Sequence, residues 1–195
     1  MKTSAQDVKK LREETGISIM MCKNALLKTD GDFKEAKKYL REQGEKIAAK
    51  KLIRETHQGI IASYIHNNLK IGAMIEVHCE TDFVAKNEEF QNLCKELAIQ
   101  VAGYNPSYVS SDYIAESDLK KQEMLYRDEF SGRKLTKERI EKAVQSKLEK
   151  FKKENSLLSQ PYFKDEKKTI EDLIKIAIAR LGENIQVKRF VRYQI

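Results

Sequence analysis

The hydrophobic pattern of residues 70–87 constrains the fold more than any other stretch of this sequence. Apolar residues recur at every second position from Ile71 to Cys79, which is the period of a β-strand with one buried face. From Asn87 onward they recur at helical spacing, and Asn87 is expected to cap that helix. The chain has to change from strand to helix within a few residues, so the pattern predicts an α+β fold.

The connection between this strand and this helix contains Thr81-Asp82-Phe83-Val84. In one interpretation the ring of Phe83 folds back into the hydrophobic core, as aromatic rings commonly do. In the other, the ring is exposed beside the carboxylate of Asp82 and forms a tip that binds a partner protein. The residue pattern alone leaves both interpretations open.

Residues 1–45 are expected to form a module of three short helices. Ser4, Ser18 and Asp32 are the expected N-caps, and the third helix is expected to end near Gly44. A module of this size buries little apolar surface, so it is marginally stable alone and is typical of docking modules.

The second of these helices begins with Ile19, Met20 and Met21, which are more apolar residues than a narrow buried stripe requires. One interpretation places all three in the core of the module. The other turns one or two of them outward as an apolar contact surface, because methionine adapts to varied surfaces.

Beyond the module we expect a charged helical connector over residues 46–58 and an α+β core over residues 59–195. The strand period resumes at Gly59, and Asn67-Asn68 is expected to form a tight hairpin turn before the strand already described. The tail from Ile185 to Ile195 alternates as a third strand. Helices are expected to begin near Asn87, Ser117, Thr136 and Thr169. These elements predict a small antiparallel sheet flanked by helices.

Charge and composition favour a binding protein. Thirty-seven Lys and Arg against 30 Asp and Glu give a net charge of +7 and a pI near 9.1, which suits nucleic acid or an acidic protein surface. Lys and Glu are mixed along most predicted helices, which is typical of solvated faces, so RNA binding stands as an alternative. No apolar run could span a bilayer, no signal peptide is recognised and the three cysteines match no zinc pattern. We therefore expect a soluble protein in a reducing compartment.

The sequence contains no recognisable catalytic, cofactor or metal-binding pattern. His57, His66 and His78 lack metal-ligand spacing to other ligating residues. Glycine-rich phosphate loops and a nucleophile elbow are also absent from the sequence. We expect no cofactor, no metal and no enzymatic chemistry.

Several separated stretches nevertheless resemble the elongation factor Ts family of bacteria and organelles. They are Leu11–Gly16, Met20–Leu26, Gly31-Asp32, Ala36–Leu40, Glu76–Asn87, Leu157–Pro161 and Gly182–Ile185. The resemblance covers nearly the whole chain in order. It departs from the family at Met21, where an acidic residue is usual, and at His78, where asparagine is usual.

The resemblance implies a guanine-nucleotide exchange factor for elongation factor Tu, with a ubiquitin-associated-like N-terminal module and an α+β core. In that family the tip matched by Thr81-Asp82-Phe83-Val84 intrudes near the magnesium site of the GTPase. Ile19 and Met20 match the pair that makes an apolar contact with the GTPase domain. The resemblance therefore favours the exposed interpretation of Phe83.

The sequence has room for one copy of the core, and short relatives with one copy pair as homodimers, so a homodimer is expected. The resemblance implies the bacterial cytoplasm or a plastid stroma, with neither a membrane nor a specific nucleic acid as partner. Two alternatives remain: a basic protein that binds RNA or the ribosome, and a ubiquitin-associated-type adaptor for which residues 1–55 would suffice.

Overall fold

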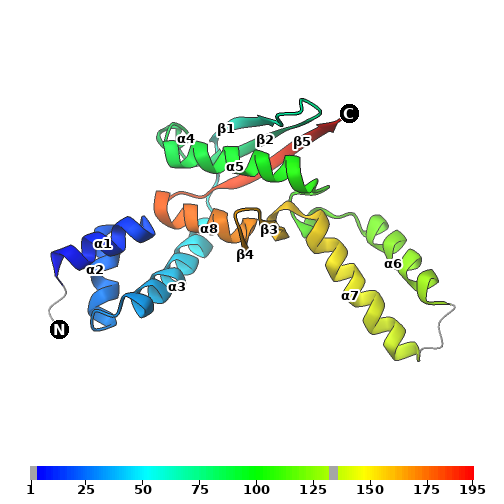
Figure 1. The fold of residues 1–195 in the computed structure, drawn as a ribbon, viewed down its shortest axis with the longest axis horizontal. Coiled ribbons are helices and arrows are strands. Elements are labelled where there is room, and N and C mark those ends of the chain that lie inside the picture. Colours follow the sequence, from blue (N-terminus) through cyan, green and yellow to red (C-terminus); the bar gives the residue numbers. More distant parts are fainter. Residues whose placement is uncertain (1–3, 132–135) are drawn as a thin grey trace. The chain divides into compact units, whose positions relative to one another are not determined.

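A computed structural model describes residues 4–131 and 136–195 (Figure 1). The chain divides into two compact units, each assembled from separate segments. The first comprises Met1–Ala62, Glu76–Cys94 and Asp172–Val187; the second comprises Ser63–Ile75, Lys95–Glu171 and Lys188–Ile195. Helices combined with a small antiparallel sheet confirm the predicted α+β class. The sequential division into 1–45, 46–58 and 59–195 stays a prediction.

The first three helices form a three-helix module within the first unit (Figure 1). They are α1 (Ala5–Thr15), α2 (Ile19–Lys28) and α3 (Phe33–Lys51). The predicted caps are confirmed, because the side chains of Ser4, Ser18 and Asp32 each accept a hydrogen bond from a main-chain N–H of the first turn. The buried core of the module consists of Val8, Leu11, Cys22, Ala25, Leu26, Ala36 and Leu40.

The prediction that the third helix ends near Gly44 was wrong. Gly44 is buried inside α3, which continues to Lys51. A Cβ on Gly44 would lie 3.4 Å from the Cβ of Ala179 in α8 (Ile170–Leu181), so the missing side chain lets the two helices approach closely. The glycine serves packing between helices here and does not end the helix.

The three-stranded sheet consists of β1 (Gln58–Ile65), β2 (Ile71–Cys79) and β5 (Gln186–Gln194), in the order β1-β2-β5. The tail therefore pairs with the earlier hairpin, as predicted. The alternation along β2 is also confirmed, since Ala73, Ile75, Val77 and Cys79 are all buried.

The turn between β1 and β2 is longer than predicted. The ladder closes with the N–H of His66 donating to the carbonyl of Ile71 at 2.8 Å, so residues 67–70 lie in the loop. The left-handed residue is Leu69, with φ of 57°, and neither asparagine has positive φ. Asn68 contributes through its side chain, whose Oδ1 accepts a hydrogen bond from the N–H of Lys70 at 3.0 Å.

One face of the sheet is apolar and exposed within the second unit. Val191 and Tyr193 of β5 lie on it with Ile65 of β1 and Met74 of β2, and all four are exposed. The opposite face of β5 is held to α5 (Glu88–Tyr104), since Arg192 Nε donates to the carbonyl of Ala102 at 2.9 Å. The alternating apolar residues of β5 therefore lie on a face of the sheet that is exposed to water.

The rest of the second unit includes a helical hairpin and a small β-hairpin. Helices α6 (Glu116–Ser131) and α7 (Lys137–Asn155) run side by side over a small core of Phe130, Val144 and Leu148 (Figure 1). Strands β3 (Pro161–Tyr162) and β4 (Asp165–Thr169) pair as an antiparallel hairpin that the sequence did not predict. The short helix α4 (Asp82–Ala85) belongs to the first unit and follows β2.

Gly59 allows β1 to approach β2 closely. A Cβ at this position would lie 2.2 Å from the carbonyl oxygen of Val77 and 2.8 Å from the Cα of His78. Both are main-chain atoms, so the strands would have to move apart. We expect Gly59→Ala to lower the free energy of unfolding by about 2 kcal/mol or more, measured by urea denaturation.

Gly103→Ala is the matched control, because a Cβ on Gly103 meets nothing within 4 Å. Because Gly103 lies in α5 and alanine has the higher helix propensity, the free energy of unfolding of this variant should not fall and should rise by up to about 1 kcal/mol. Equal losses in the two variants would contradict the close approach of β1 and β2 at Gly59.

Candidate functional site

The strand-to-helix connection forms a compact tip. After Cys79 the chain leaves β2, and residues Asp82–Ala85 make the single helical turn α4. Thr81 is the N-cap of this turn, with its Oγ1 accepting a hydrogen bond from the N–H of Val84 at 3.4 Å. Asn87 then caps α5, as predicted, since its Oδ1 accepts from the N–H of Glu89 at 2.8 Å. We call Thr81-Asp82-Phe83-Val84 the tip.

Phe83 is 81% exposed, so the interpretation that its ring lies in the core was wrong. The ring lies outside because Phe83 is the second residue of a single turn whose only buried residue is Ala85. A large ring held in water by a defined turn is available for contact with another molecule.

Asp82 supplies a negative charge beside this ring. Its Oδ2 lies 2.7 Å from Nζ of Lys86, and this hydrogen bond lowers the pKa of the Asp82 carboxyl below its ordinary value. The carboxylate therefore stays ionised at neutral pH. An exposed ion pair one helical turn apart is weak, so Asp82 can exchange Lys86 for another partner.

Residues from two distant segments hold the base of the tip. Glu183 accepts hydrogen bonds from the N–H of Thr81 at 3.0 Å, from the Thr81 hydroxyl at 2.6 Å and from the N–H of Glu80 at 3.1 Å. Glu80 in turn accepts from the N–H of Asn184 at 2.6 Å and from Arg54 at 3.3 Å. The sequence analysis missed these residues, because no local pattern connects positions 80 and 183.

His78, the departure noted at the strand end, is half-buried beside the tip. Its Nε2 lies 2.7 Å from Oε1 of Glu76, two residues earlier on the same face of β2. Its Nδ1 is buried without a partner among the described residues. His78 therefore contacts its own strand, and the structure gives it no part in the exposed surface of the tip.

A second exposed apolar surface lies at the start of α2. Ile19 and Met20 are 51% and 65% exposed, whereas Met21 packs against the core of the module. The structure therefore decides the open question about these three residues: two face outward and one faces inward. We call Ile19 and Met20, with the hollow described next, the docking surface.

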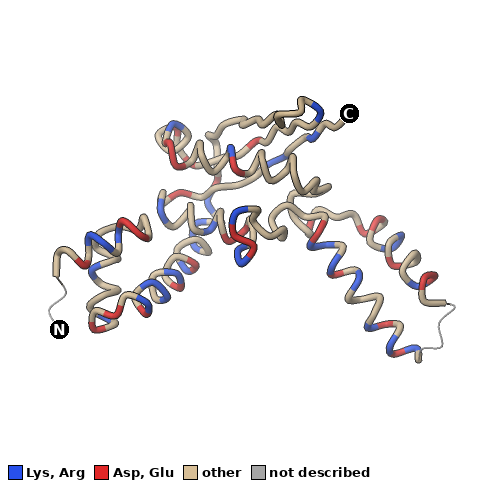
Figure 2. Tube along the Cα trace, in the orientation of Figure 1, with Lys and Arg blue, Asp and Glu red and all other residues tan. Residues whose placement is uncertain are grey.

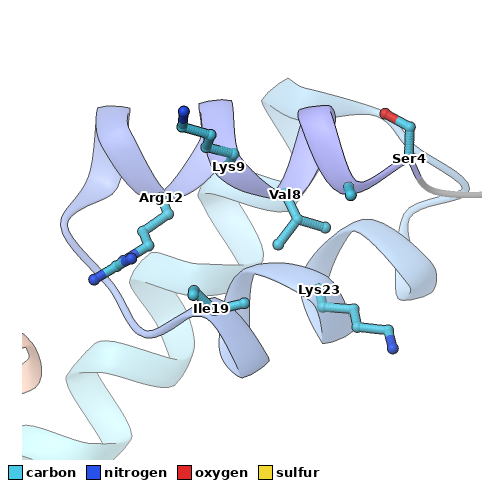
Figure 3. Close-up of a pocket in the computed structure, with 7 residues that line it drawn as sticks. Ser4, Val8, Lys9, Arg12, Ile19 and Lys23 are labelled. Carbon is cyan, nitrogen blue, oxygen red and sulfur yellow. The ribbon is translucent and has the colours of Figure 1, made fainter.

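The hollow beside Ile19 has a volume of about 520 Å³ and lies between α1 and α2. Val8 and Ile19 form its apolar middle, and Lys9, Arg12 and Lys23 extend outward from its edge (Figure 3). The arrangement suits a partner surface with an apolar centre and acidic surroundings. These three cations carried no signal in the sequence, where they resemble any solvated helix face.

The tip and the docking surface belong to the same compact unit. Arg180 of α8 connects their supporting elements, since its Nε donates to the carbonyl of Thr15 at 2.9 Å and its Nη1 lies 3.1 Å from Glu89. Thr15 ends α1, and Glu89 lies in the first turn of α5, the helix that follows the tip. Gly16 caps the end of α1 with a φ of 70°, and this left-handed conformation explains the glycine at this position.

The described residues contain no cluster of His, Cys, Asp and Glu able to hold a metal ion. Among the helices of the described ranges, none combines the length and the apolar character needed to cross a membrane. The arrangement of exposed groups on the tip and the docking surface suits contact with a macromolecule.

The comparisons with known proteins agree with one another. A family model described as "Elongation factor TS" matches residues 4–195. The chain is 48% identical over 195 residues to "Elongation factor Ts" of Thermodesulfovibrio yellowstonii, covering all of this chain and 97% of that protein. It is 46% identical over 195 residues to the protein of the same name from Coprothermobacter proteolyticus, and 45% identical to that from Fervidobacterium nodosum, with 99% of each covered.

Cys79 and Cys94 are buried thiols, and they should make the free energy of unfolding depend on pH in the alkaline range. Burial, with Cys79 as a second cause, raises the pKa of the Cys94 thiol from 9.0 to about 12. The folded protein therefore keeps a proton that the unfolded chain loses, so this contribution is complete below pH 9 and lost as the pH rises towards 12.

Between about pH 9 and 11, the free energy of unfolding should fall less steeply with pH in Cys94→Ala than in the wild type. The two slopes should differ by up to about 1.4 kcal/mol per pH unit. Urea denaturation at a series of pH values measures both slopes. Wild-type and variant curves that run parallel over this range would contradict the raised pKa.

Proposed function

The chain belongs to the elongation factor Ts family of translation elongation factors, and on this premise we propose that it is a guanine-nucleotide exchange factor for elongation factor Tu. It binds the GDP-bound and nucleotide-free forms of that GTPase. It promotes release of GDP and reloading with GTP, in the bacterial cytoplasm or an equivalent compartment. No covalent bond changes, so the protein is not an enzyme in the chemical sense.

The exposed ring of Phe83 is the observation that carries this proposal. Burying such a ring against a partner contributes about 1.5–3 kcal/mol. If the ring is buried only when the GTPase is distorted, the exchange factor prefers the nucleotide-free form. By linkage, GDP binding is then weakened by the same factor, about 10- to 100-fold for this side chain alone.

Asp82 supports the same mechanism through its charge. A carboxyl group of ordinary acidity is ionised at neutral pH, and the exposed pairing of Asp82 with Lys86 is readily exchanged. Near the Mg²⁺ site of the GTPase, a carboxylate competes with the groups that bind the metal, and its negative charge repels the phosphates of GDP. Weaker metal binding leaves the phosphates of GDP less well neutralised, so GDP dissociates faster.

The docking surface provides affinity that does not depend on the nucleotide. Ile19 and Met20 supply apolar contact, and Lys9, Arg12 and Lys23 attract an acidic surface and accelerate association. In this scheme the docking surface keeps the factor on the GTPase while the tip acts on the nucleotide site.

We also propose that the protein acts as a homodimer that pairs through the exposed face of its sheet. Ile65, Met74, Val191 and Tyr193 place apolar side chains from three strands on one face of the second unit. A sheet face of this kind is stable in water when another layer covers it. A second copy of this chain offers the same face.

The RNA-binding alternative is less well supported. Lysines and arginines alternate with acidic residues along α3 and α7 (Figure 2). For example, Arg41 lies 3.2 Å from Glu45 in α3, and Lys142 lies 2.8 Å from Glu138 in α7. Paired charges of this kind suit a solvated surface more than a path for phosphates. The adaptor alternative leaves the exposed ring of Phe83 without a role.

The exchange mechanism predicts that the tip is required. Release of a fluorescent GDP analogue from elongation factor Tu should be accelerated by the wild-type protein. The acceleration should fall about tenfold or more in Phe83→Ala, because the transition to the nucleotide-free complex loses the ring contact. Leu125→Ala on α6 removes another exposed apolar side chain and should exchange like wild type. Equal rates for Phe83→Ala and wild type would contradict the role of the ring.

The dimer predicts a mass in solution of twice 22.6 kDa, measured by sedimentation equilibrium at about micromolar concentration. Tyr193→Glu places a charge on the sheet face and should shift the protein to monomer. Tyr113→Glu is the matched control, since Tyr113 and Tyr193 are 70% and 69% exposed. A monomeric wild type, or dissociation by both substitutions, would contradict pairing through this face.

A further inference from the structure

Apolar burial at the tip is small, since Val84 is half-buried and only Ala85 of α4 is buried. Phe83 lies outside, and α4 is a single turn of four residues. One isolated turn of helix does not persist in water, because nucleation of a helix is unfavourable. Some interaction from outside the tip must therefore fix its conformation.

Glu183 supplies that interaction. Its two carboxylate oxygens accept three hydrogen bonds, from consecutive main-chain N–H groups of Glu80 and Thr81 and from the Thr81 hydroxyl. Two fixed N–H groups set the direction in which the chain enters α4, and the hydroxyl fixes the side chain that caps it. Hydrogen bonds to an ionised acceptor are the stronger kind, and the Thr81 hydroxyl bond is short at 2.6 Å.

Glu183 is itself held in place before any partner arrives. Gly182, with φ of 77°, ends α8 in the left-handed conformation that turns the chain towards the tip. Nζ of Lys51 donates to the carbonyl of Gly182, and the N–H of Asn184 donates to Glu80. The main chain is therefore anchored on both sides of Glu183.

From this geometry we infer that Glu183 is a positioning residue for exchange, which orders the tip so that Phe83 enters the GTPase without first losing conformational freedom. The inference rests on the proposed function of the tip. A preordered wedge binds its target more strongly because less entropy is lost on association. Glu183 acts through Thr81 and need not touch the GTPase.

The principal variant is Glu183→Gln, which keeps the size of the side chain and removes the charge that accepts three donors. Release of the GDP analogue, measured against exchange-factor concentration, should show a maximal rate about tenfold lower. The concentration for half-maximal effect should change by less than about twofold, because the docking surface is intact. Glu138→Gln on α7 is the matched control, since Glu138 is exposed and pairs with Lys142; it should behave like wild type.

A second readout does not depend on the GTPase. The chain contains no tryptophan, so Phe83→Trp gives a single tryptophan at the tip, which is excited selectively at wavelengths that the eight tyrosines do not absorb. Fluorescence anisotropy should decay faster when Glu183→Gln is added to Phe83→Trp, and should be unchanged when Glu138→Gln is added. Slow exchange together with unchanged anisotropy would overturn the inference, as would a wild-type maximal rate in Glu183→Gln.

A double-mutant cycle separates positioning from a general structural role. In the Phe83→Ala background, adding Glu183→Gln should cause a much smaller loss of exchange than in the wild-type background, because the ring is already absent and only Asp82 remains to be positioned. An equal additional loss would show that Glu183 acts elsewhere and would overturn the inference. If Glu183→Gln does not fold, Thr81→Val removes the hydroxyl that donates to Glu183 and also accepts from the N–H of Val84, and it should show the same two changes.

The failure of the proposed function is distinguishable from the failure of this inference. Wild-type protein that does not accelerate GDP release would refute the exchange function. The anisotropy of the Phe83→Trp protein would still decide whether Glu183 orders the tip.

Discussion

The first unit depends on a reciprocal set of hydrogen bonds where three segments meet. The N–H of Glu80 donates to Glu183, and the N–H of Asn184 donates to Glu80. The fully buried Asn184 side chain also donates from Nδ2 to the carbonyls of Leu52 and Arg54, where the chain leaves α3. Leaving a buried polar group without a partner costs about 1–3 kcal/mol, so these bonds specify one arrangement of the three segments.

This arrangement explains how a small protein can keep apolar side chains in water without losing its shape. The tip, the docking surface and the outer face of the sheet each expose apolar residues. Each is supported by polar groups behind it: Glu183 behind the tip, Arg180 between α1 and α5, and Arg192 behind β5. The exposed apolar residues are thus available for contact with partner molecules. Hydrogen bonds to the segments behind them set their positions.

In the exchange function that we propose, the same division separates two requirements. The share of the affinity that comes from the docking surface must not depend on the nucleotide, so that the factor can bind the GDP-bound form as well as the nucleotide-free form. The action on the nucleotide must depend on it, because a ligand that binds both states equally shifts nothing. A basic and apolar docking surface suits the first requirement, and a rigid tip with a ring and a carboxylate suits the second.

Much of the local structure followed from the sequence, because caps and periodicities act between neighbouring residues. Ser4, Ser18, Asp32 and Asn87 cap their helices as predicted, and the alternation along β2 gives its buried face. The residues of the tip, and Ile19 and Met20 of the docking surface, were also identified from the sequence through the family resemblance; the structure adds that Phe83 is exposed, that Met21 is not, and that three cations surround the hollow.

Other features were decided by contacts between distant segments. Gly44 continues a helix because Ala179 packs against it, and the apolar face of β5 is open because the opposite face holds α5. The link from Glu183 to Thr81 spans 102 positions of sequence. The sequence by itself determined where helices and strands begin and which side chains alternate, since these depend on local hydrogen bonds and spacing. Only the tertiary structure decided which apolar faces stay exposed and what holds the tip, because those depend on which distant residues the fold brings within hydrogen-bonding distance.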